Sequence, residues 1–109
     1  MDRIQIIDNS DQFREAKDAA IARALEVIGL EAEKYAKLEC PVDTGNLRNS
    51  ISHAIENSTE TVYIGTNVEY APYVEMGTVR TKAQPFLRPA VENHQNEYIR
   101  LAKEELKHA

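Results

Sequence analysis

The sequence predicts a single α+β domain, in which a long N-terminal helix and a C-terminal helix pack on one face of a small antiparallel sheet. Two stretches, one near the start and one at the end of the chain, carry apolar residues at helical spacing. Between them lies a segment in which apolar and polar residues alternate, as in half-buried strands. The length of 109 residues is that of one domain, which we expect to comprise residues 1–109.

The composition limits the classes of function. A hydrophobic content of 42% and a charged content of 28% are ordinary values for a globular protein. The net charge of −5 has the opposite sign to that of a general nucleic-acid binder. We also expect no membrane span and no secretory signal, because no long apolar run occurs and the N-terminus is polar. Cys40 is the single cysteine, which excludes an internal disulfide, fits a reducing cytoplasm and predicts a small half-buried residue at a helix end.

The first elements are a short strand over residues 3–7 and a helix that runs from Ser10 to about Leu38. Asn9 and Ser10 offer N-caps, and Gly29 indicates a close contact or a bend in mid-helix. A helix of this length exceeds the diameter of a small domain, so we expect one end to project and to meet a partner chain. The predicted apolar stripe consists of Ile21, Ala24, Leu25, Ile28, Ala32 and Tyr35.

An antiparallel hairpin is predicted over residues 49–67, because two alternating runs flank turn-forming residues at 57–60. One or two helical turns follow at residues 70–77, with Pro72 in the first turn and Gly77 after the last. Residues 78–84 form a polar loop. Pro85 and Pro89 then bracket the start of the last helix, whose apolar stripe is Leu87, Val91, His94, Tyr98 and Leu101.

The triplet Asp43-Thr44-Gly45 raises the possibility of an aspartic-protease-like enzyme. Such catalysis needs two carboxylates that share a proton, each on a turn between strands, and a homodimer could supply the second copy. Here the triplet instead follows a long helix and a proline, Pro41, and we see no second strand with a glycine-led turn to brace a dyad. The surroundings therefore favour a structural turn.

A turn accounts for each residue of this motif. Pro41 ends the helix, and Asp43 or Thr44 accepts a hydrogen bond from a backbone N–H two or three residues later. Gly45 supplies a backbone angle that other residues avoid. Leu47 then enters the core, next to Arg48.

Other chemistry is not indicated. His53, His94 and His108 lie far apart, without a carboxylate or cysteine at metal-ligand spacing; we expect core or surface roles for them and no cofactor. No nucleotide-binding loop occurs. Arg80 and Lys82 could contact phosphate, although so few charges are more typical of a solvated loop.

The segment YAPYVEMG, residues 70–77, stands out as a candidate interaction surface. Tyr70, Tyr73 and Met76 are of the residue types that are enriched at protein–protein contacts. A turn that simply covers the sheet would explain the same residues, and both can hold.

Three motifs in order resemble a family of tailed-phage neck proteins named for gene product ten of the phage Hong Kong 97. The family pattern P-V-D-T-G-x-L-R-x-S-I occurs at residues 41–51, a G-T followed by Y-A-x-Y-V-E-x-G-T at 65–78, and P-F-L-R-P-A at 85–90. The resemblance covers nearly the whole chain.

The resemblance implies a structural role without catalytic residues, and it identifies the D-T-G triplet as a turn signature. Such proteins act as ring subunits at the head–tail junction, where they join head-completion proteins to tail-tube or tail-terminator proteins. The implied location is the virion, and the host cytoplasm during assembly, in a phage or a prophage. An acidic ring would let DNA pass without sequence-specific contacts. The alternatives are the protease-like enzyme at residues 43–45 and a generic protein-interaction module.

Overall fold

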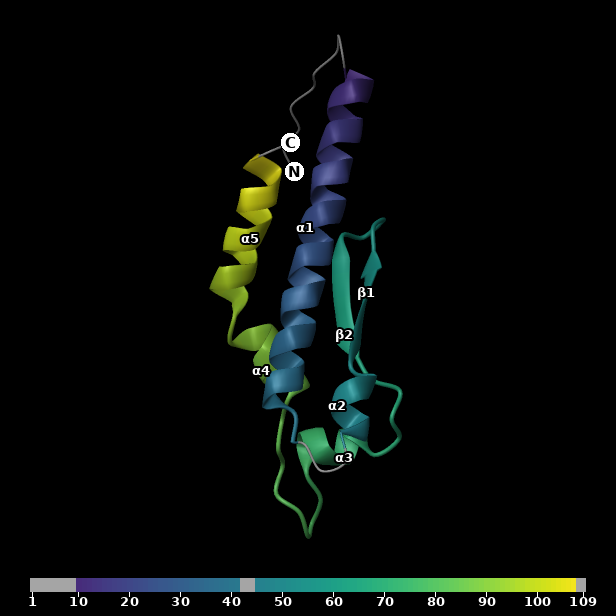
Figure 1. Ribbon diagram of the computed structural model, residues 1–109, viewed down its shortest axis with the longest axis vertical. Helices are drawn as coiled ribbons and strands as arrows, with labels where there is room; N and C mark the ends of the chain where they lie inside the picture. Colours follow the sequence, from purple (N-terminus) through teal and green to yellow (C-terminus); the bar gives the residue numbers. More distant parts are fainter. Residues whose placement is uncertain (1–9, 42–44, 108–109) are drawn as a thin grey trace.

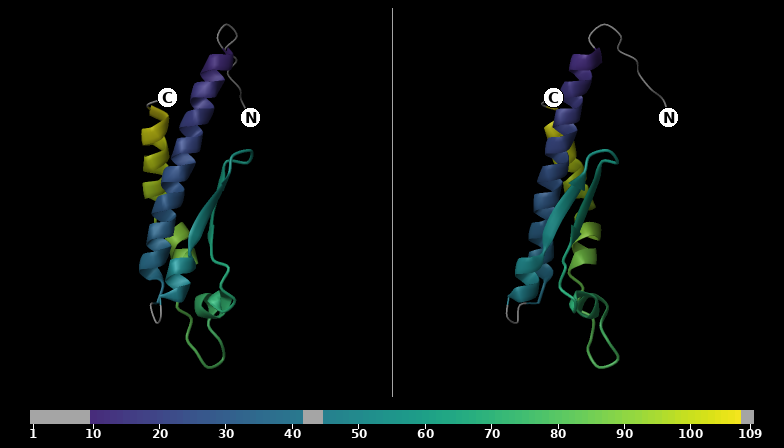
Figure 2. Two further views of the ribbon diagram at one scale, coloured as in Figure 1. Left: turned by 45° about the vertical axis from the view of Figure 1, so that its right-hand side comes forward. Right: turned by 90° about the vertical axis from the view of Figure 1, so that its right-hand side faces the viewer.

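The computed structural model describes residues 10–41 and 45–107, which form an elongated molecule of 63 × 22 × 20 Å (Figure 1). The long helix α1, Ser10–Glu39, is 30 residues in length, as the sequence predicts. It extends past the end of α5 and past the hairpin turn, so its N-terminal end projects (Figure 2). The predicted strand at residues 3–7 and the predicted N-cap Asn9 lie outside the described residues.

The sheet is the predicted hairpin, but it begins at Ser52 rather than at residue 49, because residues 49 and 50 belong to a short helix. Strands β1 (Ser52–Glu56) and β2 (Thr61–Gly65) pair antiparallel, with His53 opposite Ile64. The chain reverses through a turn in which Glu60 has a φ of 53°.

Helix α1 lies between the sheet and the C-terminal helix (Figures 1 and 2). It packs against both strands on one side and against α4 (Leu87–Glu92) and α5 (Gln95–Lys107) on another. The α+β class is therefore confirmed, with one difference in arrangement: α5 packs mainly on α1 rather than on the sheet. Each of the six residues of the predicted stripe of α1 is buried or half-buried.

The last helix differs from the prediction, because it is broken into α4 and α5 at Asn93 and His94. The hydroxyl of Tyr98 donates a hydrogen bond to the Ala90 carbonyl over 2.5 Å, which satisfies an acceptor near the end of α4. The ring of His94 stacks on Tyr35 of α1 at 3.6 Å between centroids. Tyr98 and His94 thus stabilise the junction between α4 and α5 and its contact with α1. Val91, by contrast, points outward and is 46% exposed.

The contact between α1 and α5 is completed by a hydrogen bond of 2.5 Å from the Tyr35 hydroxyl to a carboxylate oxygen of Glu97. This bond, helped by burial, raises the pKa of Tyr35 to about 12. The same bond lowers the pKa of Glu97. Burial raises the pKa of Tyr98 to about 12 as well, so the hydroxyls of both tyrosines stay protonated at neutral pH.

The core gathers at the end of the molecule opposite the projecting helix. Its largest fully buried side chain is Phe86, which precedes α4. The half-buried side chains that pack against the buried residues of this core are Tyr35, Ile64, Val68, Val74 and Leu87. Most of the buried members are small, which lets the elements approach closely; they are Ala36, Cys40, Leu47, Ile51, Ala71, Phe86 and Ala90.

Candidate interaction surface

The first motif connects α1 to the one-turn helix α2, Asn46–Ser50, which the sequence did not predict. Gly45 has a φ of 83°, the left-handed conformation expected from the motif. Leu47 is buried in the core as predicted, and the Ser50 hydroxyl donates to its carbonyl over 2.6 Å. Pro41 is half-buried and Arg48 exposed. Asp43 and Thr44 lie outside the described residues, so their predicted capping roles stay predictions.

The second motif forms α3, Ala71–Met76, and confirms the short helix. Ala71 and Val74 face the core, whereas Tyr73 and Met76 are 62% and 78% exposed. Tyr70 precedes the helix and accepts a hydrogen bond of 3.4 Å from the Asn46 side chain. This bond links the second motif to the first.

Glu75 joins the second motif to the third. One oxygen of its carboxylate accepts hydrogen bonds from the backbone N–H groups of Phe86 and Leu87, at 3.1 and 2.9 Å. The other oxygen accepts from the N–H of Arg88 at 3.1 Å. These donors begin α4 and have no partner within the helix, so a carboxylate is well suited to them. Glu75 of the second motif therefore fixes the start of α4, which lies in the third motif.

The loop between α3 and α4 is held by its own hydrogen bonds. Gly77 has a φ of 78°, and a β-carbon added there would lie 2.6 Å from the backbone nitrogen of Ala83. The Thr78 hydroxyl accepts from the N–H groups of Arg80 and Thr81. The tip of this loop exposes Val79 fully, together with the predicted contact residues Arg80 and Lys82.

A cavity of about 410 Å³ opens between the turn of the first motif and the second motif with its loop. Its wall is mostly apolar and includes one cation, the ammonium of Lys82. The residues that line it are Pro41, Gly45, Leu47, Tyr70, Tyr73, Val74, Thr78, Thr81, Lys82 and Gln84.

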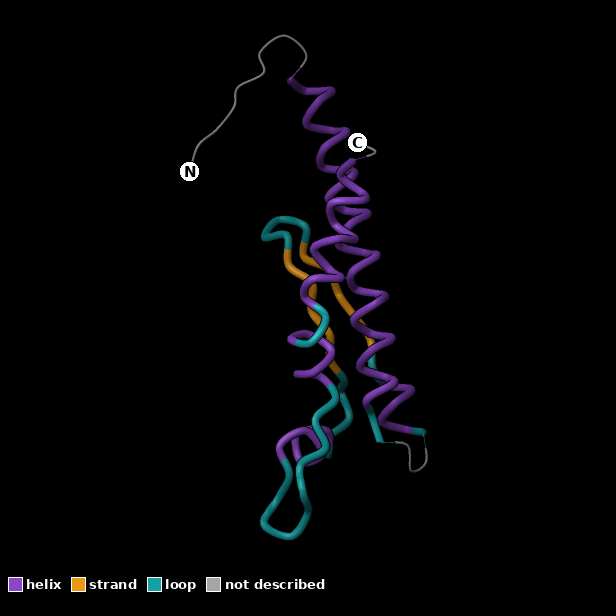
Figure 3. Tube along the Cα trace, turned by 90° about the vertical axis from the view of Figure 1, so that its left-hand side faces the viewer, coloured by secondary structure: helices purple, strands orange, loops and turns teal. Residues whose placement is uncertain are grey.

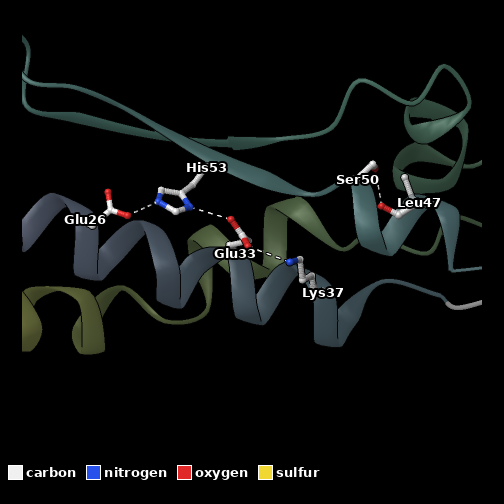
Figure 4. A network of polar contacts seen from close by, with 6 residues as sticks. All are labelled: Glu26, Glu33, Lys37, Leu47, Ser50 and His53. Atoms are coloured by element: carbon white, nitrogen blue, oxygen red, sulfur yellow. Dashed lines mark hydrogen bonds and ion pairs between the residues drawn. The ribbon is translucent and has the colours of Figure 1, made fainter.

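The structure also contains a polar cluster that the sequence did not predict (Figure 4). The ring of His53, on β1, lies between two carboxylates of α1, with Nδ1 at 2.8 Å from Glu33 and Nε2 at 2.9 Å from Glu26. Ionised carboxylates only accept hydrogen bonds, so both contacts are satisfied when both ring nitrogens carry a proton. Lys37 adds a second cation, 2.9 Å from Glu33. The spacing of Glu26 and Glu33, seven residues apart on one helix face, was the signal available in the sequence.

This cluster shifts the titration of its members. The hydrogen bonds to Glu33 and then to Glu26 raise the pKa of His53. The hydrogen bonds from His53 and Lys37 lower the pKa of Glu33. The two carboxylates contact different ring nitrogens, an arrangement that favours the cationic form of the imidazole. Within residues 10–41 and 45–107, no group of three or more His, Cys, Asp or Glu side chains is placed to hold a metal ion.

Other predicted positions are placed as follows. Cys40 is buried, and burial raises the pKa of its thiol. His108 lies outside the described residues. The D-T-G triplet falls between two helices, α1 and α2, rather than between strands. None of the helices in the described part of the chain is long and apolar enough to cross a bilayer.

The sequence model of one protein family matches residues 4–77; that family is described as "Bacteriophage HK97-gp10, putative tail-component". The matched residues contain the first motif and the second motif as far as Gly77, and they end before the third. No curated protein matches the chain, and no solved structure does.

Proposed function

Because the chain belongs to the HK97-gp10-like family of phage tail components, we propose that it is a structural subunit of the head–tail junction of a tailed phage or prophage, where copies of it form a ring. The observation that carries the proposal is that the first two motifs line one groove beside an exposed apolar surface, while Glu75 of the second motif holds the start of the third.

The exposed side chains are suited to binding protein. Tyrosine and methionine contribute large contact areas, and the side chain of methionine adapts to an irregular partner surface. Tyr73 and Met76 are presented on a helix that is held by the core and by Glu75, so little order has to be gained on binding. The partners that we propose are further copies of this chain, the head-completion protein on one side, and the tail-tube or tail-terminator protein on the other.

The charge of the chain fits a conduit for DNA. At a net charge of −5 the subunit repels phosphate on average, so a ring of such subunits would allow DNA to pass without binding a particular sequence. The site of action is the virion, after assembly in the host cytoplasm. The role is non-enzymatic.

A nonsense mutation in the gene tests this function. We expect DNA-filled heads beside separate or defective tails in electron micrographs of the lysate, and rescue when the intact gene is supplied in trans. Normal infectious virions that lack the protein would overturn the assignment. Portal, major capsid and tape-measure genes beside this gene would distinguish the assignment from a generic interaction module.

The state of the isolated chain follows from its size. A subunit of 12.3 kDa offers contacts of modest area, and association costs about 4–15 kcal/mol in lost rigid-body freedom. We therefore expect a monomer or small oligomer in dilute solution and a closed ring within the virion, where partner rings hold the subunits at high effective concentration. Sedimentation velocity of the purified chain and symmetry-averaged micrographs of the neck check the two states.

A further inference from the structure

An exposed apolar line runs along the C-terminal half of α1. Leu30 and Leu38 are 53% and 67% exposed and lie eight residues apart on one face, with Lys34 between them. Leu30 lies two positions before Ala32, and Leu38 lies two positions after Ala36; both alanines are buried. At 3.6 residues per turn, two positions are about 200° apart, so the line faces away from the core. We call Leu30, Lys34 and Leu38 the helix stripe.

A second exposed apolar surface lies on α3 and the loop that follows it. Tyr73, Met76 and Val79 are exposed here, while Ala71 and Val74 of the same segment pack inward. We call Tyr73, Met76 and Val79 the loop surface.

The two surfaces lie on opposite sides of the same end of the molecule. Ala36 of α1 and Ala71 of α3 belong to one core cluster, so the core lies between the helix stripe and the loop surface. Figures 2 and 3 show the C-terminal end of α1 on one side of this end of the molecule, with α3 and its loop on the other. A subunit with two different contact surfaces on opposite sides can bind the next copy head to tail, and such contacts form rings when the rotation closes.

The charges favour contact between unlike surfaces. Arg80 and Lys82 flank the loop surface, and neither forms an ion pair within the described residues. Two loop surfaces face to face would therefore bring four cations together.

The helix stripe is nearer to neutral. Lys34 and Lys37 are paired with Glu31 and Glu33, at 3.1 and 2.9 Å. Arg48 also borders the stripe, because it lines one hollow with Leu30 and Leu38, and it is exposed. Glu39, beside Leu38, is exposed as well and balances this cation; neither residue forms an ion pair in the part of the chain that the structure describes. Charges of opposite sign at the rim of an apolar contact select its register and partner.

We propose that the helix stripe of one copy binds the loop surface of the next copy, as the repeating contact of the ring. The leucines meet Met76 and Val79, and Glu39 lies near Arg80 and Lys82 of the neighbour. The inference rests on the proposed function, because it assigns the surfaces by which that ring closes.

Disulfide cross-linking tests the pairing. Leu38→Cys and Met76→Cys are combined in one chain in a Cys40→Ala background, which removes the native thiol. Concentrated protein, and virions complemented with this variant, are oxidised and run on a non-reducing gel. A head-to-tail contact gives a ladder of multimers, because each chain is joined to two neighbours. Docked thiols have a high effective concentration, so the ladder should exceed that of the control by at least about tenfold.

The matched control combines Leu38→Cys with Ser58→Cys, at an exposed position of the hairpin turn. Each single cysteine variant should remain mostly monomeric. A dimer formed by Leu38→Cys alone or by Met76→Cys alone would show a two-fold contact and overturn the proposal. Multimers no more abundant than in the control would overturn it too.

A charge exchange gives a second readout. Arg80→Glu with Lys82→Glu should reduce the ladder severalfold, and Glu39→Lys in the same chain should restore part of it. Continued full cross-linking after the reversal would count against the assigned register. The failure of this inference is separable from the failure of the function: virions that contain the protein at the neck but give no ladder refute only the contact, whereas infectious virions without the protein refute the function.

Discussion

Gly29 of α1 lies directly beneath the imidazole of His53: a β-carbon added to this glycine would be 2.5 Å from Cδ2 of the ring. The absence of a side chain on the helix therefore allows the ring to reach the two carboxylates that flank it. This close approach is one of the contacts by which the hairpin packs on α1.

Gly29→Ala should destabilise the protein by about 1–3 kcal/mol, because overpacking displaces the ring and outweighs the higher helix propensity of alanine. In a His53→Ala background the ring is gone, and the same substitution should stabilise by up to about 1 kcal/mol. Urea unfolding of the native protein, the two single variants and the double variant measures whether the effect of Gly29→Ala on the free energy of unfolding changes sign. Equal effects in both backgrounds would contradict the contact.

Stability should depend on pH through His53 and Glu33. The pKa of His53 is raised in the fold, so its contribution is complete below the ordinary value of 6.5 and is lost as pH rises through the folded value. The pKa of Glu33 is lowered, so its contribution is complete above 4.5 and is lost as pH falls through the folded value. The difference in unfolding free energy between the native protein and His53→Gln should thus be greatest from about pH 4.5 to 6.5.

Glu26→Gln is the control for this pH dependence. It removes one of the two carboxylates that contact the ring of His53. The stability that is lost as pH rises should therefore be lost at a lower pH than in the native protein. Thermal unfolding across a series of buffers measures both effects. A difference between native protein and His53→Gln that does not vary with pH would refute the cationic imidazole.

Glu75→Ala should cost about 1–3 kcal/mol, because three backbone N–H groups at the start of α4 lose their charged acceptor. Glu75→Gln should cost less, since its amide oxygen still accepts from Phe86 and Leu87. The matched control is Glu92→Ala, whose ion pair with Arg88 is long and exposed, so an effect of about 0–1 kcal/mol is expected. Chemical unfolding ranks the three variants.

Asp43→Asn should leave any proteolysis in a preparation unchanged and alter only stability, by about 1 kcal/mol if a capping bond is lost. Cleavage of an unfolded substrate, with and without a pepstatin-type inhibitor, is the assay. Inhibitor binding that disappears with Asp43→Asn would restore the protease hypothesis.

The sequence predicted the elements whose signal is local. The long helix, the hairpin and α3 follow from periodicity and from turn residues such as Gly45 and Gly77, and all are present. The close contact at Gly29 was also expected, but its partner was not, because His53 lies in a different element. A contact between elements has no signature in either segment alone.

The break of the last helix was missed for a related reason. Val91, His94 and Tyr98 keep helical spacing through the break, so the pattern predicts one helix. The structure shows that the Tyr98 hydroxyl bonds the Ala90 carbonyl across the break and that His94 stacks on Tyr35 of α1, a contact with another element. Of the predicted interaction residues, the exposure of Tyr70, Tyr73, Met76, Arg80 and Lys82 is established. Their contact with a partner stays a prediction.

The projecting end of α1 has a consequence for how the protein opens. The buried cluster around Phe86 lies at the other end, whereas residues 16–19 of α1 are exposed. Backbone amides near Ala36 should therefore exchange with solvent only on global unfolding, while those of residues 16–19 exchange through local fraying. The helix that makes the molecule long consequently contains segments of very different local stability. Its projecting end can fray and re-form without unfolding the core.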